Sequence, residues 1–154
     1  MKVFLVLMII VAAMAAACTS VESIALNTDD AGSALKGYDT VAYFAVNAAV
    51  KGDAKYAYVW NGAKWLFSSE ENMNKFIADP AAYAPQFGGY CAYAVSEGYT
   101  ADADPEAWKV VDGKLYLNYS RDVQKTWEKN QAERIENARK NWQGFKIKKP
   151  EHKG

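Results

Sequence analysis

Two short turns constrain the fold of this chain more than any other part of its sequence. Asn61-Gly62 and Asp112-Gly113 each lie between runs rich in aromatic and aliphatic residues. A two-residue hairpin turn of this type needs positive φ at both positions, which Asn, Asp and Gly tolerate. The sequence therefore predicts two β-hairpins, one over residues 56–67 and one over residues 107–118.

The first turn also predicts which residues face each other across the hairpin. The expected cross-strand pairs are Trp60 with Ala63, Tyr58 with Trp65, and Tyr56 with Phe67. These six side chains then share one strongly aromatic face of the sheet. We interpret this face as part of the core, and an exposed platform for a ligand or partner is the alternative.

In the second hairpin the two faces differ in character. One face carries Trp108, Val110, Leu115 and Leu117, and the other carries Lys109, Lys114 and Tyr116. We therefore expect the first face to be buried and the second to contact water.

The segments around the first hairpin predict a strand and a helix. Residues 38–44, "YDTVAYF", are rich in β-forming residues and indicate an N-terminal strand. After the hairpin, Ser68 and Glu71 have the spacing of a capping box, with Ser68 as the N-cap of a helix. Pro80 is expected to end this helix.

The segments around the second hairpin complete the predicted fold. Residues 79–90, "DPAAYAPQFGGY", indicate an irregular connection, and from Ser120 a helical period predicts one long helix that ends near Gly144. The sequence thus predicts an α+β fold. It has two short antiparallel hairpins plus an N-terminal strand, one helix between the hairpins and a long C-terminal helix.

The first residues have the layout of a secretory signal peptide. Residues 1–17, "MKVFLVLMIIVAAMAAA", carry one positive charge, then an apolar run, then small residues. We expect the remainder to divide into a tether (residues 18–34), a domain (residues 35–143) and a basic tail (residues 144–154). These features predict export across the inner membrane to the periplasm.

Cys18 lies at the expected cleavage site, in the string "AAACTS". This string resembles a bacterial lipobox, so we expect Cys18 to be lipidated and the protein to be a lipoprotein anchored to a membrane. Ordinary cleavage nearby, which leaves Cys18 as a free thiol, is the alternative. A disulfide between Cys18 and Cys91 is then also open.

The charge of the chain argues against one class of partner. It has 18 Lys and Arg residues and 18 Asp and Glu residues. A neutral balance provides no electrostatic surface for nucleic acid, so we expect no nucleic-acid partner.

Cys91 is the cysteine within the predicted domain, in the string "FGGYCAYAV". It is open to three interpretations: a small buried side chain, a reactive thiol or a metal ligand. If it is reactive, Gly88 and Gly89 can adopt backbone angles that direct amide groups at a thiolate. A reaction with one cysteine passes through a sulfenic acid or a mixed disulfide and needs an external reductant.

Several strings together resemble the YHS domain family, and in particular its envelope members with a "GGYCA" segment, some of them selenoprotein-like. They are "GYDTVAYF", "WNGAKWLFSSEEN", "FIADPAAYAPQFGGYCAYAV" and "DPEAWKVVDGKLYLN". In the selenoprotein-like members selenocysteine can occupy the position of Cys91. This resemblance implies redox or nucleophilic chemistry at that residue.

The same resemblance implies metal binding, with copper as the expected ion, because some YHS domains occur in copper-transporting ATPases. This chain departs from their cysteine pattern, however. The predicted domain offers Cys91 and, more weakly, Met73 as soft ligands, and its histidine, His152, lies in the tail. A copper site would therefore need a partner chain.

These observations lead to a first hypothesis and two alternatives. The first is a bacterial envelope YHS-domain protein that acts as an accessory thiol-redox protein through Cys91. The alternatives are a copper-binding or copper-delivery module and a non-catalytic module whose aromatic face binds a ligand or a protein.

Overall fold

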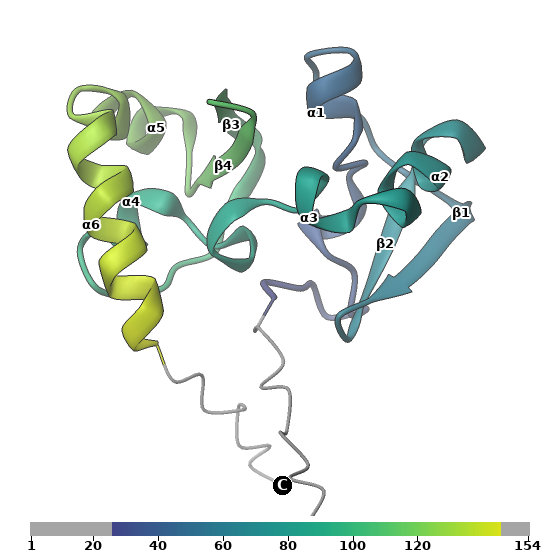
Figure 1. Ribbon diagram of the computed structural model, residues 1–154, viewed down its shortest axis with the longest axis horizontal. Coiled ribbons are helices and arrows are strands. Elements are labelled where there is room, and N and C mark those ends of the chain that lie inside the picture. The colour runs from purple at the N-terminus through teal and green to yellow at the C-terminus, as the bar shows by residue number, and fades with distance from the viewer. Residues whose placement is uncertain (1–25, 146–154) are drawn as a thin grey trace, which may run out of the picture.

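The computed structural model describes residues 26–145, which form two lobes, each built around one antiparallel hairpin (Figure 1). The first lobe contains η1 (Leu35–Gly37), α1 (Ala42–Ala45), β1 (Asp53–Trp60), β2 (Ala63–Phe67), α2 (Glu70–Ala78) and α3 (Pro80–Tyr83). The second lobe contains η2 (Gln86–Gly89), α4 (Ala92–Ser96), β3 (Asp104–Val111), β4 (Lys114–Asn118), α5 (Arg121–Glu128) and α6 (Gln131–Gly144). The predicted α+β class is confirmed.

Both predicted turns are present, with left-handed backbone angles at each position. The φ angles are 51° and 78° at Asn61 and Gly62, and 50° and 71° at Asp112 and Gly113. In the first hairpin, Trp60 pairs with Ala63 and Tyr58 with Trp65, as predicted. The third predicted pair is wrong, because an irregularity between Asp53 and Ala57 places Asp53, and not Tyr56, opposite Phe67.

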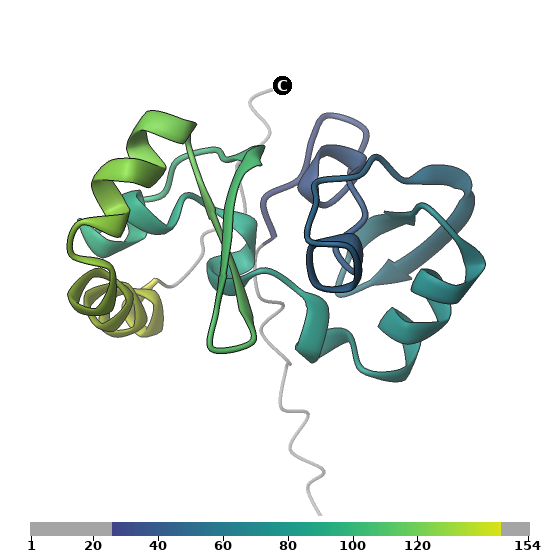
Figure 2. The same cartoon turned by 90° about the horizontal axis from the view of Figure 1, so that it is seen from above.

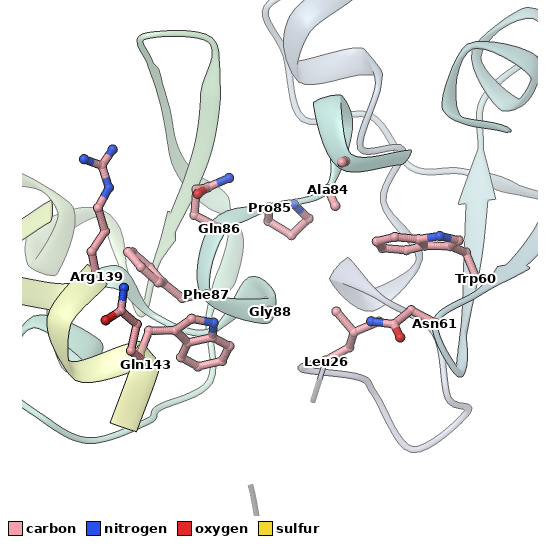
Figure 3. A pocket seen from close by; sticks show the side chains of 12 residues that line it. Leu26, Trp60, Asn61, Ala84, Pro85, Gln86, Phe87, Gly88, Arg139 and Gln143 are labelled. Carbon is pink, nitrogen blue, oxygen red and sulfur yellow. The ribbon is translucent and has the colours of Figure 1, made fainter. Parts of the chain in front are cut away.

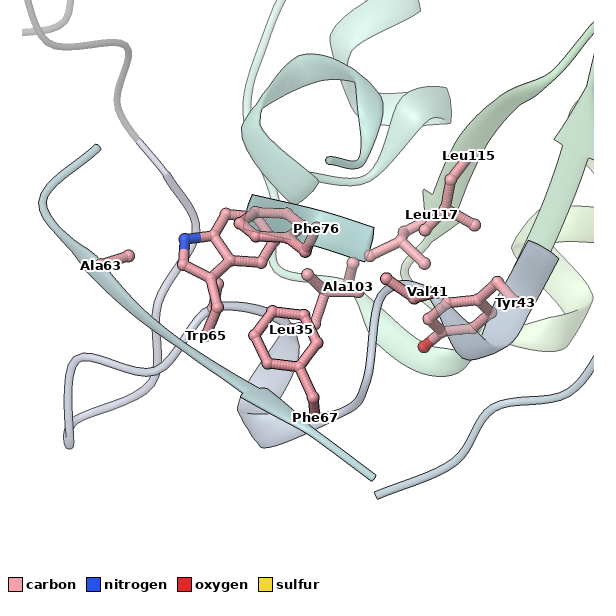
Figure 4. Packing of buried hydrophobic residues seen from close by; sticks show 11 residues of the cluster. Leu35, Val41, Tyr43, Ala63, Trp65, Phe67, Phe76, Ala103, Leu115 and Leu117 are labelled. Carbon is pink, nitrogen blue, oxygen red and sulfur yellow. The ribbon is translucent and has the colours of Figure 1, made fainter. Parts of the chain in front are cut away.

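The aromatic face of the first hairpin packs in the core of the first lobe (Figure 4). Phe76 of α2 covers it, and its ring centroid lies 4.8 Å from that of Trp65, which is 1% exposed. Tyr58 and Trp60 are partly buried against the same cluster. The interpretation of this face as core therefore holds for its centre, and a broad exposed platform does not form.

The β3–β4 hairpin lies on the side of the second lobe that faces the first lobe, and it has core on both sides (Figure 2). Leu115 and Leu117 pack into the first lobe's cluster, whereas Tyr116 packs into a second cluster with Trp127 of α5, at a centroid distance of 5.5 Å. The expectation that the face with Tyr116 contacts water is wrong at that residue, which is 1% exposed. Its partners come from helices more distant in the sequence, so alternation within the strand does not reveal them.

The predicted N-terminal strand over residues 38–44 is wrong, because Asp39 turns the chain there. Its Oδ1 accepts hydrogen bonds from the backbone N–H groups of Val41 and Ala42, at 2.9 Å and 3.3 Å. Such a cap offers the backbone a helical turn in place of a sheet ladder. The chain then forms the short helix α1 despite its β-forming composition.

Asp39 also shifts the predicted start of the next helix by one residue. Its Oδ2 accepts hydrogen bonds from both the backbone N–H and the hydroxyl of Ser68, at 2.8 Å and 2.6 Å. Ser69 therefore caps α2 in place of Ser68, and its hydroxyl accepts from the Asn72 N–H.

Two further helical predictions need correction. The long C-terminal helix is present as α6 and ends at Gly144, but it begins at Gln131 and not near Ser120. The backbone leaves the helical region at Asn130, with φ −132° and ψ 44°, and α5 is a separate helix before it. The connection after α2 is more helical than expected. Asp79 caps α3, whose first residue is Pro80, and further short helices follow.

The predicted tether is part of the folded unit from residue 26 onward. The Asn27 N–H donates to the Gly88 carbonyl at 2.8 Å, and the Ala34 N–H donates to the Lys64 carbonyl at 2.9 Å. The domain therefore begins before residue 35. The predicted signal peptide, Cys18 and the rest of the tether lie outside the described residues, as do His152 and most of the tail. Within residues 26–145 no helix is long and apolar enough to span a bilayer.

Replacing the buried Asp39 tests its part in the fold. We expect Asp39→Ala to lower the free energy of unfolding by about 3 kcal/mol, because it leaves several buried donors without an acceptor. Asp30→Ala, at an exposed position, should change it by less than about 0.5 kcal/mol. Urea denaturation measures both, and equal effects would refute this role for Asp39.

Acid should weaken the attachment of the N-terminal segment to the second lobe. Partial burial raises the pKa of Asp102, but hydrogen bonds from Lys36 and Asn27 outweigh this and hold the pKa below its usual range. A lowered folded-state pKa gives a stabilisation that is complete above the unfolded value of about 3.9 and lost as the pH falls through the folded value.

The difference in unfolding free energy between the wild type and Asp102→Asn should therefore be constant near neutral pH. It should shrink as the pH falls below about 3.9. Urea denaturation across this range measures it, and a difference that does not change with pH would contradict this linkage.

Candidate functional site

Cys91 lies in the second lobe, between η2 and α4, and it is a free thiol. Its N–H donates to the Ala101 carbonyl at 3.0 Å, and it forms an isolated parallel bridge with Leu117 of β4. The residue as a whole is 1% exposed. The backbone is thus fixed on both sides, and the sulfur has a defined position beside the end of β4.

The sulfur of Cys91 has polar neighbours on the residues that follow β4. The Tyr119 N–H donates to Sγ at 3.2 Å, and Sγ lies 3.9 Å from Asn118 Oδ1, where the thiol proton has an acceptor. Backbone N–H donors stabilise a thiolate more than a thiol. The sulfur thus has one hydrogen-bond acceptor and one backbone donor close to it.

Asn118 is fully buried, and only part of its side chain is paired. Its Oδ1 also accepts from the Tyr93 N–H at 3.3 Å, which fixes the orientation of the amide. Its Nδ2 has no hydrogen-bond partner among the described residues. A buried donor without a partner is costly in a protein interior, and such groups are concentrated at functional sites.

A pocket of about 280 Å³ reaches Cys91 from the surface. Its lining residues are Cys91, Tyr93, Ala94, Tyr99, Ala101, Tyr119 and Val123. Tyr99 and Tyr119 are 52% and 60% exposed, so the pocket has an open edge bordered by two phenol rings. A small reagent can therefore approach Cys91 although little of the residue is exposed.

The structure assigns other roles to Gly88 and Gly89, the glycines expected to support a thiolate. Their carbonyl groups accept hydrogen bonds from the backbone and side chain of Asn27. Gly89 has φ 80°, and a Cβ there would lie 3.3 Å from Pro85 Cγ. The glycines therefore attach the N-terminal segment, and the amide that reaches the sulfur comes from Tyr119.

Cationic side chains do not line the Cys91 pocket in the described part of the chain. Three basic side chains that could support a thiolate each pair with a carboxylate elsewhere. Lys75 pairs with Glu71, Lys109 with Glu128 and Arg121 with Glu106.

The two soft metal ligands expected from the sequence lie in different lobes. Met73 belongs to α2 and packs against the core of the first lobe, whereas Cys91 immediately precedes α4 of the second lobe (Figure 1). Residues 26–145 contain no group of three or more His, Cys, Asp or Glu residues that could hold a metal ion. The donors within residues 26–145 therefore do not fit a copper site.

Comparison with known families identifies the first lobe. The family model of the YHS domain matches residues 41–87, from the residue before α1 to η2. Residues 41–87 are a YHS domain. Members of the YHS family are associated with the handling of metals such as copper. No curated protein and no solved structure matches the chain.

The matched region ends before Cys91, so the cysteine site belongs to the lobe that follows the YHS match. Asn118 and Tyr119, which complete this site, were not predicted from the sequence. They follow the predicted second hairpin, and only the path of β4 brings them to Cys91.

Filling the pocket should slow the modification of Cys91. In a Cys18→Ser background, we expect Val123→Phe to slow labelling of folded Cys91 by iodoacetamide about tenfold, because the added ring occupies the route to the sulfur. The matched control is Val46→Phe, at a valine that is exposed in the first lobe. Intact-mass spectrometry measures the rates, and equal rates in the two variants would exclude this route.

Proposed function

We propose that this chain is an accessory thiol-redox protein of the bacterial envelope and that Cys91 carries its chemistry. The observation that supports this most is the pairing of an open pocket with a sulfur that accepts a backbone hydrogen bond. A cysteine with only a packing role needs neither. The envelope location, with a lipid on Cys18 as the membrane attachment, is part of the proposal and rests on the sequence alone.

The chemistry that fits this arrangement is the two-electron reduction of a small hydroperoxide. The Cys91 thiolate attacks one oxygen, the O–O bond breaks, and the leaving oxygen takes a proton and departs as water or an alcohol. The sulfur is then a sulfenic acid. The Tyr119 N–H stabilises the attacking anion, and Asn118 lies where it can orient the oxygen bound to sulfur.

Return to the thiol needs two further thiols, since the described residues contain no second cysteine. One external low-molecular-weight thiol condenses with the sulfenic acid, releases water and forms a mixed disulfide. A second thiol then attacks this disulfide and leaves Cys91 reduced and the two external thiols joined. The volume of the pocket suits small thiols better than a protein partner.

Metal handling, the activity associated with the family, is the second candidate. A site that includes Cys91 would need soft ligands from outside residues 26–145, because Met73 lies in the other lobe. We therefore place the thiol reaction first and derive no step that involves a metal.

Trapping the sulfenic acid tests the proposal. After treatment of the Cys18→Ser chain with hydrogen peroxide and dimedone, we expect one dimedone adduct, located on Cys91 by peptide mass spectrometry. Cys18→Ser combined with Cys91→Ser is the control and should give none. With an external thiol present, the chain should consume more than one peroxide per molecule. Absence of the adduct, or oxidation that the thiol does not reverse, would refute the redox function.

A further inference from the structure

A second pocket lies where the two lobes meet, and it shares no lining residue with the Cys91 pocket (Figure 3). Its volume is about 380 Å³, within the range of pockets that bind small molecules. Trp60, at the end of β1, lies on one side, and Phe87 of η2 lies on the other. We call this pocket the interlobe cleft.

Aromatic side chains form both walls of the interlobe cleft, and each is held by neighbouring rings. Trp60 packs edge-on against Trp65 and Phe76, at centroid distances of 5.7 Å in both cases. On the opposite side Phe87 packs edge-on against Trp142 of α6, at 6.0 Å. Trp60 and Trp142 are partly exposed, whereas Phe87 is buried behind the second wall. Two walls of fixed rings are suited to a flat aromatic ligand.

The backbone at Phe87 adds a second observation. This residue has φ 55° and ψ 38°, a left-handed conformation that is unfavourable for a bulky side chain. Strained backbone of this kind is concentrated at ligand and active sites, where the surrounding structure maintains it. Here it holds the Phe87 ring in the wall of the interlobe cleft.

The charge of the lining residues determines which aromatic ligand fits. None of the lining residues is acidic, and Arg139 of α6 is the cationic one. Arg139 makes no ion pair within residues 26–145, whereas Arg121 and Arg134 are paired with glutamates. Gln86 and Gln143 add neutral amides to the lining. The interlobe cleft thus combines aromatic walls with one unpaired positive charge.

We propose that the interlobe cleft binds a small planar aromatic anion. The ring of the ligand lies between Trp60 and the pair of Phe87 and Trp142, and its carboxylate faces the guanidinium of Arg139. This site is independent of the thiol chemistry proposed for Cys91.

Three naphthalene probes of one shape and different charge test the proposal by isothermal titration calorimetry of the full chain. They are 2-naphthoate, the neutral 2-naphthamide and the cationic 2-naphthylmethylammonium. We expect 2-naphthoate to bind most tightly. Equal affinity for the three, or no measurable binding of 2-naphthoate, would overturn the proposal.

Substitution of Arg139 tests the contribution of its charge to binding separately from that of the aromatic walls. Arg139→Gln should weaken the binding of 2-naphthoate about tenfold and leave that of 2-naphthamide unchanged. Lys140→Gln is the matched control, because Lys140 is the next residue on α6, is exposed and does not line the cleft. A loss of the same size in both variants would indicate attraction to the helix surface in general and would refute the site.

The position of the ligand can be tested in the wild-type chain, without a substitution that could destabilise it. In nuclear magnetic resonance spectra, saturating 2-naphthoate should shift the indole N–H signals of both Trp60 and Trp142, which come from different lobes. A shift of only one of them, or of neither, would contradict binding between the two walls.

Discussion

The buried carboxylate of Asp39 joins the segments from which the rest of the structure is built. It is 0% exposed and accepts five hydrogen bonds from groups within residues 41–72. These donors are neutral, so the negative charge is stabilised by directed N–H and O–H groups. One oxygen begins α1 and the other fixes the turn from β2 into α2. A single side chain thus sets the relation between the first helix, the first hairpin and the helix that covers it.

This arrangement extends into the second lobe and positions the cysteine site. The turn at Asp39 places Tyr43, whose hydroxyl donates to the Pro105 carbonyl at 2.9 Å and whose ring lies 5.0 Å from Trp108. Leu115 and Leu117 of β4 pack into the first lobe. The first lobe thereby fixes the position of β4. The residues that follow Leu117 are then delivered to Cys91, one as a buried amide and the next as an N–H donor to sulfur.

The features that the sequence predicts well are those determined within a few residues. Asn61-Gly62 and Asp112-Gly113 need no distant partner to form their turns, and both hairpins were predicted. Two of the three cross-strand pairs predicted for the first hairpin are present. The strand predicted at residues 38–44 does not form, because the Asp39 side chain accepts hydrogen bonds from backbone N–H groups of this segment. The second carboxylate oxygen of Asp39 accepts a hydrogen bond from Ser68, which is distant in the sequence. Composition alone could therefore not reveal this role of Asp39.

The candidate site depends even more on contacts between residues that are distant in the sequence. Cys91 could be singled out from its string, but its hydrogen-bond partners are 27 and 28 residues away. The glycines before it looked like a source of amides, yet their carbonyls bind Asn27, in a segment read as a tether. Pairwise contacts between distant segments decide these assignments, and a single sequence does not encode them in any local pattern.

The proposed role of Cys91 requires that the fold activates its thiol and does more than bury it. The second-order rate constant of its reaction with hydrogen peroxide tests this, measured in the folded Cys18→Ser chain and in the same chain unfolded in urea at the same pH. We expect a faster reaction in the folded chain, because the Tyr119 N–H and the pocket are present only there. A slower reaction in the folded chain would show that the structure only shields the thiol, and would refute the proposed role.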